Sequence, residues 1–171
     1  MKNALLTVCC ALWIAAFNTA FADSQDEFTQ AVVGYEVTLP RVEAYESALA
    51  DLVQWVQSHP NDEKLFRDKN VRITSLDEAA KRLESVPGIK SILDKHQITG
   101  RDMSLMPMAL LSSRAVVMAE KRGTTMPPGQ TNTASVALVR ANDAQVDKLL
   151  ERIMSHLRAL RGSEKENHVN P

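Results

Sequence analysis

The sequence predicts an all-helical protein that folds as a single-domain bundle of five or six helices, with a kinked apolar helix at its centre. Three observations support this fold class. Apolar residues recur at every third or fourth position in several segments, which is the spacing of one helix face. Residues that favour helix starts precede these segments. No segment of the chain after residue 37 shows a convincing strand pattern.

The first residues have the pattern of an export signal. Lys2 supplies a positive charge, residues 4–16 form an apolar run with Thr7 as its one polar member, and Ala20-Phe21-Ala22 fits the rule for signal-peptide cleavage. The run is too short to cross a hydrocarbon core of about 30 Å as a helix. We therefore predict a signal peptide over residues 1–22, cleaved after Ala22.

The positions of the cysteines and the net charge restrict the cellular compartment and the binding partners that the sequence predicts. Cys9 and Cys10 both lie in the predicted signal peptide, so the mature chain has no thiol for a disulfide or a zinc site. The sequence also lacks Asn-x-Ser/Thr glycosylation sites. These two features favour a bacterial periplasm over a eukaryotic secretory route. The net charge of −1 and the dispersed aromatic residues give no basis for binding nucleic acid.

Residues 23–37 lack a sustained helical pattern, and we expect a flexible lead-in there. The first long helix is predicted from Thr38, with Pro40 in its first turn, to about Ser58, because Pro60 stops it. A short helix between residues 61 and 70 has little support. The apolar face of the long helix comprises Val42, Tyr45, Leu49, Leu52, Val53 and Val56.

Two short helices are predicted next. Ser75 and Glu78 have the spacing of a capping box, in which each side chain satisfies a free backbone N–H of the other residue. Pro87 ends the helix that follows and starts another. The apolar stripes of the two helices comprise Leu76, Ala79, Ala80 and Leu83, then Ile89, Ile92 and Leu93.

The most apolar stretch, Met103–Met118, follows a second capping pattern at Thr99 and Asp102. Because it is apolar on nearly all sides, we expect it to be a central helix surrounded by the others. Pro107 lies inside this stretch, where it removes one backbone hydrogen bond and clashes with the preceding turn. A kink at Pro107 is therefore predicted.

The last third of the chain is predicted as a loop, an ambiguous segment and a final helix. Residues 123–133 contain a double proline and form the loop, whereas residues 135–141 fit either a helical turn or a short strand. The final helix starts after Asn142 and ends at Gly162. We therefore predict a helical domain over residues 38–161 and a disordered tail over residues 162–171.

Four short motifs resemble those of an uncharacterised family of small exported all-helical proteins of Gram-negative bacteria. They are Thr38-Leu39-Pro40, Val86-Pro87-Gly88-Ile89, Ile98-Thr99-Gly100-Arg101-Asp102 and Val136-Ala137-Leu138-Val139-Arg140-Ala141. The resemblance covers roughly residues 38 to 160. It implies export and a helical fold, and it implies no activity.

A cluster of methionines is the first candidate site. Met103, Met106 and Met108 place three thioethers in one short segment, and soft sulfur ligands suit Cu(I). On a helix, however, Met108 lies about 200° from Met106, so one ion would contact all three only if Pro107 unwinds the turn. The alternative is that these side chains fill an irregular core. We therefore expect no metal and no cofactor, and these three methionines are the candidate ligands if a metal binds.

The sequence contains no recognised catalytic set. His96 is expected at a helix C-terminus, where a charged imidazole complements the helix dipole. Glu43 and Glu46 lie one turn apart outside the apolar stripe, which favours a solvated surface. An enzyme would instead bring several titratable side chains together in one pocket. The candidates for such a pocket are His96, Arg101, Asp102 and Arg140.

We therefore expect a non-catalytic periplasmic interaction or binding module. A groove beside Pro107, lined by Met103, Met106 and Met118, would bind an envelope protein or a small apolar ligand. Two alternatives stay open, a carrier of Cu(I) or a small apolar ligand through residues 103–108, and an enzyme of unrecognised type. The oligomeric state is also open, since the final helix could use its apolar seam in a core or a dimer.

Overall fold

The computed structural model describes residues 25–59, 75–126 and 131–166, and within these ranges the protein is all-helical. The described residues form seven helices, so the predicted count of five or six is not confirmed. The helices are α2 (Gln25–Gly34), α3 (Leu39–Ser58), α5 (Leu76–Glu84), α6 (Pro87–Lys95), α7 (Gly100–Lys121), α8 (Thr133–Ala141) and α9 (Asp143–Glu166).

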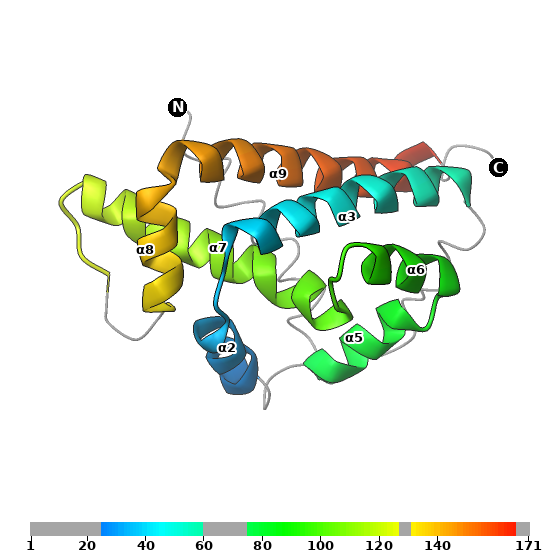
Figure 1. Ribbon diagram of the computed structural model, residues 1–171, viewed down its shortest axis with the longest axis horizontal. Coiled ribbons are helices and arrows are strands. Elements are labelled where there is room, and N and C mark those ends of the chain that lie inside the picture. The colour runs from blue at the N-terminus through cyan, green and yellow to red at the C-terminus, as the bar shows by residue number, and fades with distance from the viewer. Residues whose placement is uncertain (1–24, 60–74, 127–130, 167–171) are drawn as a thin grey trace.

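The two longest flanking helices, α3 and α9, lie side by side and run in the same direction (Figure 1). Helix α7 lies beside them and receives α5, α8 and α2 on its surface, while α6 packs between α3 and α5. None of the described helices is long and apolar enough to cross a membrane.

Helix starts follow the local signals in the sequence. The Ser75 hydroxyl accepts a hydrogen bond from the Glu78 backbone N–H at 3.1 Å, which caps α5. At α7, Thr99 Oγ1 accepts from the backbone N–H of Asp102, and the Asp102 carboxylate accepts from the Thr99 N–H, so the predicted capping box is complete. Helix α3 begins directly after Thr38, whose extended backbone leads into the first turn without a side-chain cap.

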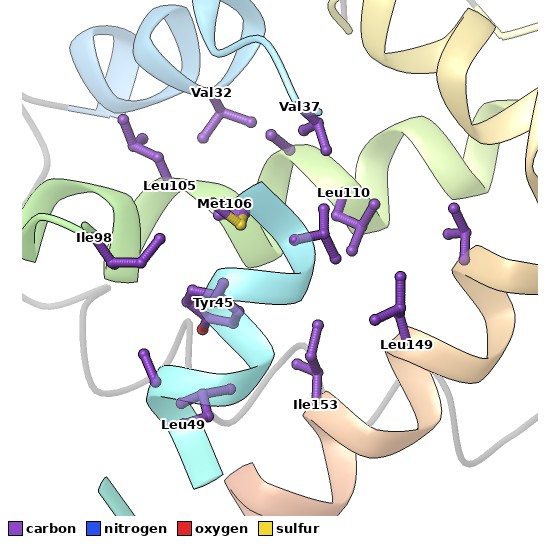
Figure 2. Close-up of a cluster of buried hydrophobic side chains, with 14 of the residues drawn as sticks. Val32, Val37, Tyr45, Leu49, Ile98, Leu105, Met106, Leu110, Leu149 and Ile153 are labelled. Atoms are coloured by element: carbon purple, nitrogen blue, oxygen red, sulfur yellow. The ribbon is translucent and has the colours of Figure 1, made fainter. Parts of the chain in front are cut away.

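The core forms where α7 meets α3, α9 and the end of α2 (Figure 2). Tyr45 and Met106 are 1% exposed, and Leu110 is fully enclosed. These side chains place one face of α7 in the core, while the central position predicted for residues 103–118 stays a prediction. Side chains from the other elements complete the cluster, among them Val32, Val37, Leu49, Ile98, Leu105, Leu149 and Ile153.

The segment predicted as a flexible lead-in is helical from Gln25 to Gly34. This expectation is wrong because Phe28, Ala31 and Val32 have the i, i+3, i+4 spacing of a helix face and pack on the core. Val32 is 9% exposed. The stripe is one turn long and stands alone, so its periodicity does not stand out in the sequence.

One open alternative is decided by the structure, and one further boundary differs from its prediction. The ambiguous residues 135–141 belong to α8, whose first turn is capped by Asn132 accepting from the Ser135 N–H at 3.1 Å. Helix α9 continues past Gly162 to Glu166, because a single glycine weakens a helix without obliging it to stop. The sequence predicts residues 162–166 as part of a disordered tail, and this prediction is wrong for them because they are helical.

The remaining sequence-based predictions are not tested by the described residues. The described residues do not include four of the predicted features. These are the signal peptide over residues 1–22, the possible helix within 61–70, the double proline of the loop and the tail over 167–171. Helix α7 continues through Pro107. The kink expected there stays a prediction.

Candidate functional site

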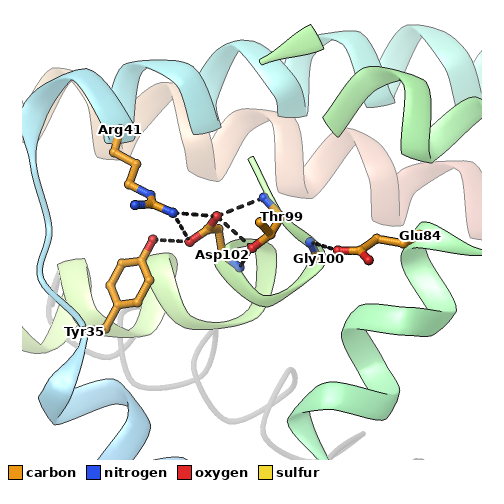
Figure 3. Close-up of polar contacts among 6 residues, drawn as sticks. All are labelled: Tyr35, Arg41, Glu84, Thr99, Gly100 and Asp102. Atoms are coloured by element: carbon orange, nitrogen blue, oxygen red, sulfur yellow. Dashed lines mark hydrogen bonds and ion pairs between the residues drawn. The ribbon is translucent and has the colours of Figure 1, made fainter. Parts of the chain in front are cut away.

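The most highly connected polar side chain among the described residues is that of Asp102, which is 3% exposed in the first turn of α7. Its Oδ1 accepts hydrogen bonds from the Tyr35 hydroxyl at 2.7 Å and from Arg41 Nη2 at 2.8 Å. Its Oδ2 accepts from Arg41 at 2.9 Å and from the Thr99 N–H and hydroxyl at 2.8 Å (Figure 3). We call Tyr35, Arg41, Thr99 and Asp102 the Asp102 cluster.

The cluster joins three elements that are distant in the chain. Tyr35 follows the end of α2, Arg41 lies in the first turn of α3, and Asp102 with Thr99 starts α7. The Arg41 guanidinium also lies over the Tyr35 ring, 5.9 Å from its centre, in a cation–π contact. The cluster therefore sets how α2 and α3 meet the start of α7.

A second carboxylate binds the same helix start. Glu84, the last residue of α5, accepts a hydrogen bond from the Gly100 N–H at 2.7 Å. The positive end of the α7 dipole thus faces two carboxylates of the chain itself. Gly100 also allows α5 to approach closely, because a Cβ there would lie 2.5 Å from the Ala80 carbonyl oxygen.

Hydrogen bonding keeps Asp102 ionised. Burial acts to raise the pKa of Asp102, but the hydrogen bonds from Tyr35, Thr99 and Arg41 outweigh it, so the pKa lies below its ordinary value. Burial, and then the hydrogen bond to Asp102, raises the pKa of Tyr35. At neutral pH the pair is therefore a neutral phenol that donates to an ionised carboxylate. A carboxylate with a lowered pKa and its lone pairs occupied is a poor general base.

The catalytic candidates from the sequence pair with different side chains in the structure. Asp102 belongs to the Asp102 cluster, and Arg101 pairs with Asp77 at 2.7 Å on the exposed side of α5. Arg140 pairs with Glu120 at 2.8 Å where α8 meets α7. Each of these three side chains, like His96, thus pairs with a different partner.

His96 is the C-terminal cap residue of α6, as predicted. Its Nε2 lies 2.7 Å from Asp51 Oδ2 on α3, and Lys95 Nζ lies at the same distance from this oxygen. The hydrogen bonds from Lys95 and His96 lower the pKa of Asp51. This pair of contacts joins α6 to α3, an arrangement that local sequence spacing does not reveal.

Glu46 lies in a similar arrangement on another side of α3. Its Oε1 lies 3.1 Å from His156 Nε2 and 3.2 Å from Arg152 Nε, both on α9. Its side chain is 16% exposed, so the prediction of a solvated surface is wrong for Glu46. Glu43 is exposed, as predicted, and accepts from Gln145 of α9 at 3.1 Å.

The candidate methionines differ in burial. Met106 is 1% exposed in the core, whereas Met103 and Met108 are half-buried and pack against it. Met118 is also half-buried, but it lies four turns along α7 from Met103, at a distance of roughly 22 Å from the helical rise. The structure therefore gives Met106 the role of a core side chain, and Met103 and Met118 are too far apart to touch one small ligand.

Sequence reasoning missed Tyr35, Arg41 and Ser135. The buried Ser135 hydroxyl accepts from the Val37 N–H at 2.9 Å and so fixes the segment between α2 and α3 to α8. A buried serine in an apolar stretch looks like a neutral spacer, since its partner lies far away in the chain. The one available signal was Tyr35 itself, which continues the spacing of the α2 apolar stripe.

No protein-family model, no curated protein and no solved structure matches this chain. Within the described ranges, no group of three or more His, Cys, Asp and Glu side chains is arranged to hold a metal ion.

Proposed function

We propose that the protein is a non-catalytic interaction or binding module of the bacterial periplasm. One observation carries this proposal: Arg101, Asp102, His96 and Arg140 each pair with a different side chain in a different place. Acid–base catalysis needs such groups to face one bound substrate. Here the chemistry of each group is used to join helices.

Export supports the periplasmic part of the proposal. The charged residue, apolar run and small-x-small pattern of residues 1–22 form the three parts of a cleaved signal peptide. The described helices reach a buried core without any cysteine, which suits a mature chain that begins after Ala22. The resemblance to a family of exported helical proteins supports the same location.

Helix α7 is the structural centre of the proposed module. We include in the proposal that α7 bends at Pro107, because the proline ring lacks the N–H that would bond to the carbonyl oxygen of Met103. The bundle arrangement of the helices around α7 belongs to the same proposal. A groove at this bend would have Met103 on its partly exposed wall, while Met106 remains in the core.

Two measurements test the location and the binding role. The N-terminal sequence of the protein released from the periplasm should begin at Asp23, and recovery of the uncleaved chain from the cytosol would contradict export. For binding, a photo-crosslinking residue is placed in living cells at the exposed positions Gln30, Ser91 and Ser155, which lie on three different helices. A binding module should give one defined product from one of these faces, and no product from any position would contradict the proposal.

Copper titration separates the module from a soft-metal carrier. Because Met106 is enclosed in the core, we expect the Met106→Leu variant and the wild type to show the same weak response to Cu(I). A wild-type affinity that the substitution abolishes, with the fold intact, would favour the carrier.

A further inference from the structure

The N-terminal helix has a restricted set of contacts. Helix α2 packs mainly on α7 and projects from the rest of the molecule on that side (Figure 1). Val32 is its buried side chain, and Phe28 and Ala31 are half-buried beside it. Its other side chains from Glu27 onward are exposed or half-buried. A helix with so little apolar burial depends on its attachment points to stay docked.

Two attachment points follow α2, and they hold different elements. The Tyr35 hydroxyl donates to Asp102 at the start of α7. Two residues later, the Val37 N–H donates to the Ser135 hydroxyl of α8, and the Val37 side chain is 2% exposed. Glu36 between them is exposed and lies outside any helix. The Ser135 hydroxyl also donates to the Tyr35 carbonyl oxygen at 3.3 Å, so the backbone from Tyr35 to Val37 is anchored on α8. The Tyr35 side chain makes a separate contact with α7.

The hydrogen bonds that Asp102 accepts also come from two sides, one from Tyr35 after α2 and the others from α3 and the start of α7. Arg41 and Thr99 bind its carboxylate from α3 and from the start of α7, and these bonds do not involve α2. Loss of the Tyr35 bond alone leaves the capping box of α7 and the Arg41–Asp102 ion pair in place. Tyr35 thus joins the α2 side to the cluster, through its hydrogen bond to Asp102 and the contact of its ring with the Arg41 guanidinium.

We propose that residues 25–35 form an arm that opens and closes on α7 as a unit separate from the remaining helices, with the Tyr35–Asp102 hydrogen bond as its latch. In the closed state Val32 lies in the buried cluster that includes Leu105 and Met106 (Figure 2). Opening withdraws Val32 and exposes this part of α7 to solvent, while Val37 holds the base of the arm. The arm is inferred from these contacts alone, so it does not depend on the proposed function.

Hydrogen exchange of the purified, natively folded protein tests the arm. Amide exchange in α2 is compared with that in α3 and α7 for the wild type, for Tyr35→Phe and for Tyr45→Phe. Tyr35→Phe keeps the ring over which Arg41 lies and removes the latch bond. Tyr45→Phe is the matched control, because it removes a phenol hydroxyl from a buried ring on α3.

The arm predicts a selective effect. In the wild type, α2 amides exchange faster than those of α3 and α7, after correction for their intrinsic rates. Tyr35→Phe accelerates the α2 amides roughly tenfold to a hundredfold more, which corresponds to one hydrogen bond to a charged acceptor. The amides of α3 and α7 change no more than in the control.

A second variant, Val32→Ala, removes the apolar contact of the arm and should show the same selectivity. Either of two results would overturn the proposal. One is that α2 exchanges together with α3 and α7 in the wild type and in both arm variants. The other is that Tyr35→Phe accelerates all helices by one common factor, because the latch would then act on the whole fold.

Discussion

Substituting Gly100 by Ala should destabilise the protein, because the added methyl group has no space. A Cβ at this position would lie 2.5 Å from the carbonyl oxygen and 2.8 Å from the Cα of Ala80, which are backbone atoms of α5. Backbone cannot rotate away as a long side chain does, so α5 and the start of α7 must separate. Overpacking of this kind costs about 1–3 kcal/mol.

The separation would also lengthen the hydrogen bond from the Gly100 N–H to Glu84, which now measures 2.7 Å. This loss acts in the same direction as the clash. The gain in helix propensity from Gly to Ala, at most about 1 kcal/mol, is small at the first residue of a helix. We therefore expect the free energy of unfolding to fall by about 1–3 kcal/mol in total.

Gly34→Ala provides the matched control. Gly34 is exposed at the end of α2, and a Cβ there meets no atom within 4 Å. The same change of residue should therefore leave stability unchanged or raise it by up to about 1 kcal/mol. Urea unfolding is followed by the fluorescence of Trp55, the one tryptophan outside the predicted signal peptide. If both variants unfold at the wild-type urea concentration, the close contact of α5 with α7 is refuted.

Three further substitutions test the core and its polar contacts. Asp102→Asn should lower stability by about 1.5–3 kcal/mol at pH 7. The folded pKa of Asp102 lies below its ordinary value of 3.8. Its contribution to the free energy of unfolding is therefore present above pH 3.8 and is lost as the pH falls through the folded pKa. Acid unfolding of the variant should accordingly be less steep. Ser135→Ala leaves the buried Val37 N–H without its acceptor and should cost about 1–3 kcal/mol in urea unfolding, and a neutral result would contradict this bond. Leu110→Ala should cost about 2–5 kcal/mol by thermal unfolding, whereas Met126→Ala, at an exposed side chain, should change little.

Local signals in the sequence were enough to predict most of the helices. The starts of α5 and α7 depend on Ser75 and Thr99, whose hydrogen-bond partners lie three residues away. The residues that form each cap therefore lie within a short stretch of the sequence. Long apolar stripes predicted α3 and α9 in the same way. Helix α2 was missed because its one-turn stripe gains its stability from α7, which is a distant part of the chain.

The Asp102 cluster could not be predicted for the same reason. Asp102 was expected to cap α7, and it does, but a carboxylate has more lone pairs than a cap uses. The remaining acceptors are filled by Tyr35 and Arg41, more than sixty residues earlier in the chain. Only the three-dimensional path of the chain decides which donors reach them.

The polar residues of α3 show why such contacts leave no periodic pattern. Arg41, Glu46 and Asp51 are spaced five residues apart, and five residues turn a helix by about 500°, so successive side chains point about 140° apart. They accordingly face three different neighbours: Arg41 pairs with α7, Glu46 with α9, and Asp51 with α6. A hydrophobic stripe repeats because one face meets one core, whereas polar contacts to several helices must diverge around the axis. A shift of α3 by one turn would keep much of its apolar face buried but would unpair all three charges at once. The apolar stripe thus supplies most of the stability of α3, and the diverging charges favour one register over its neighbours.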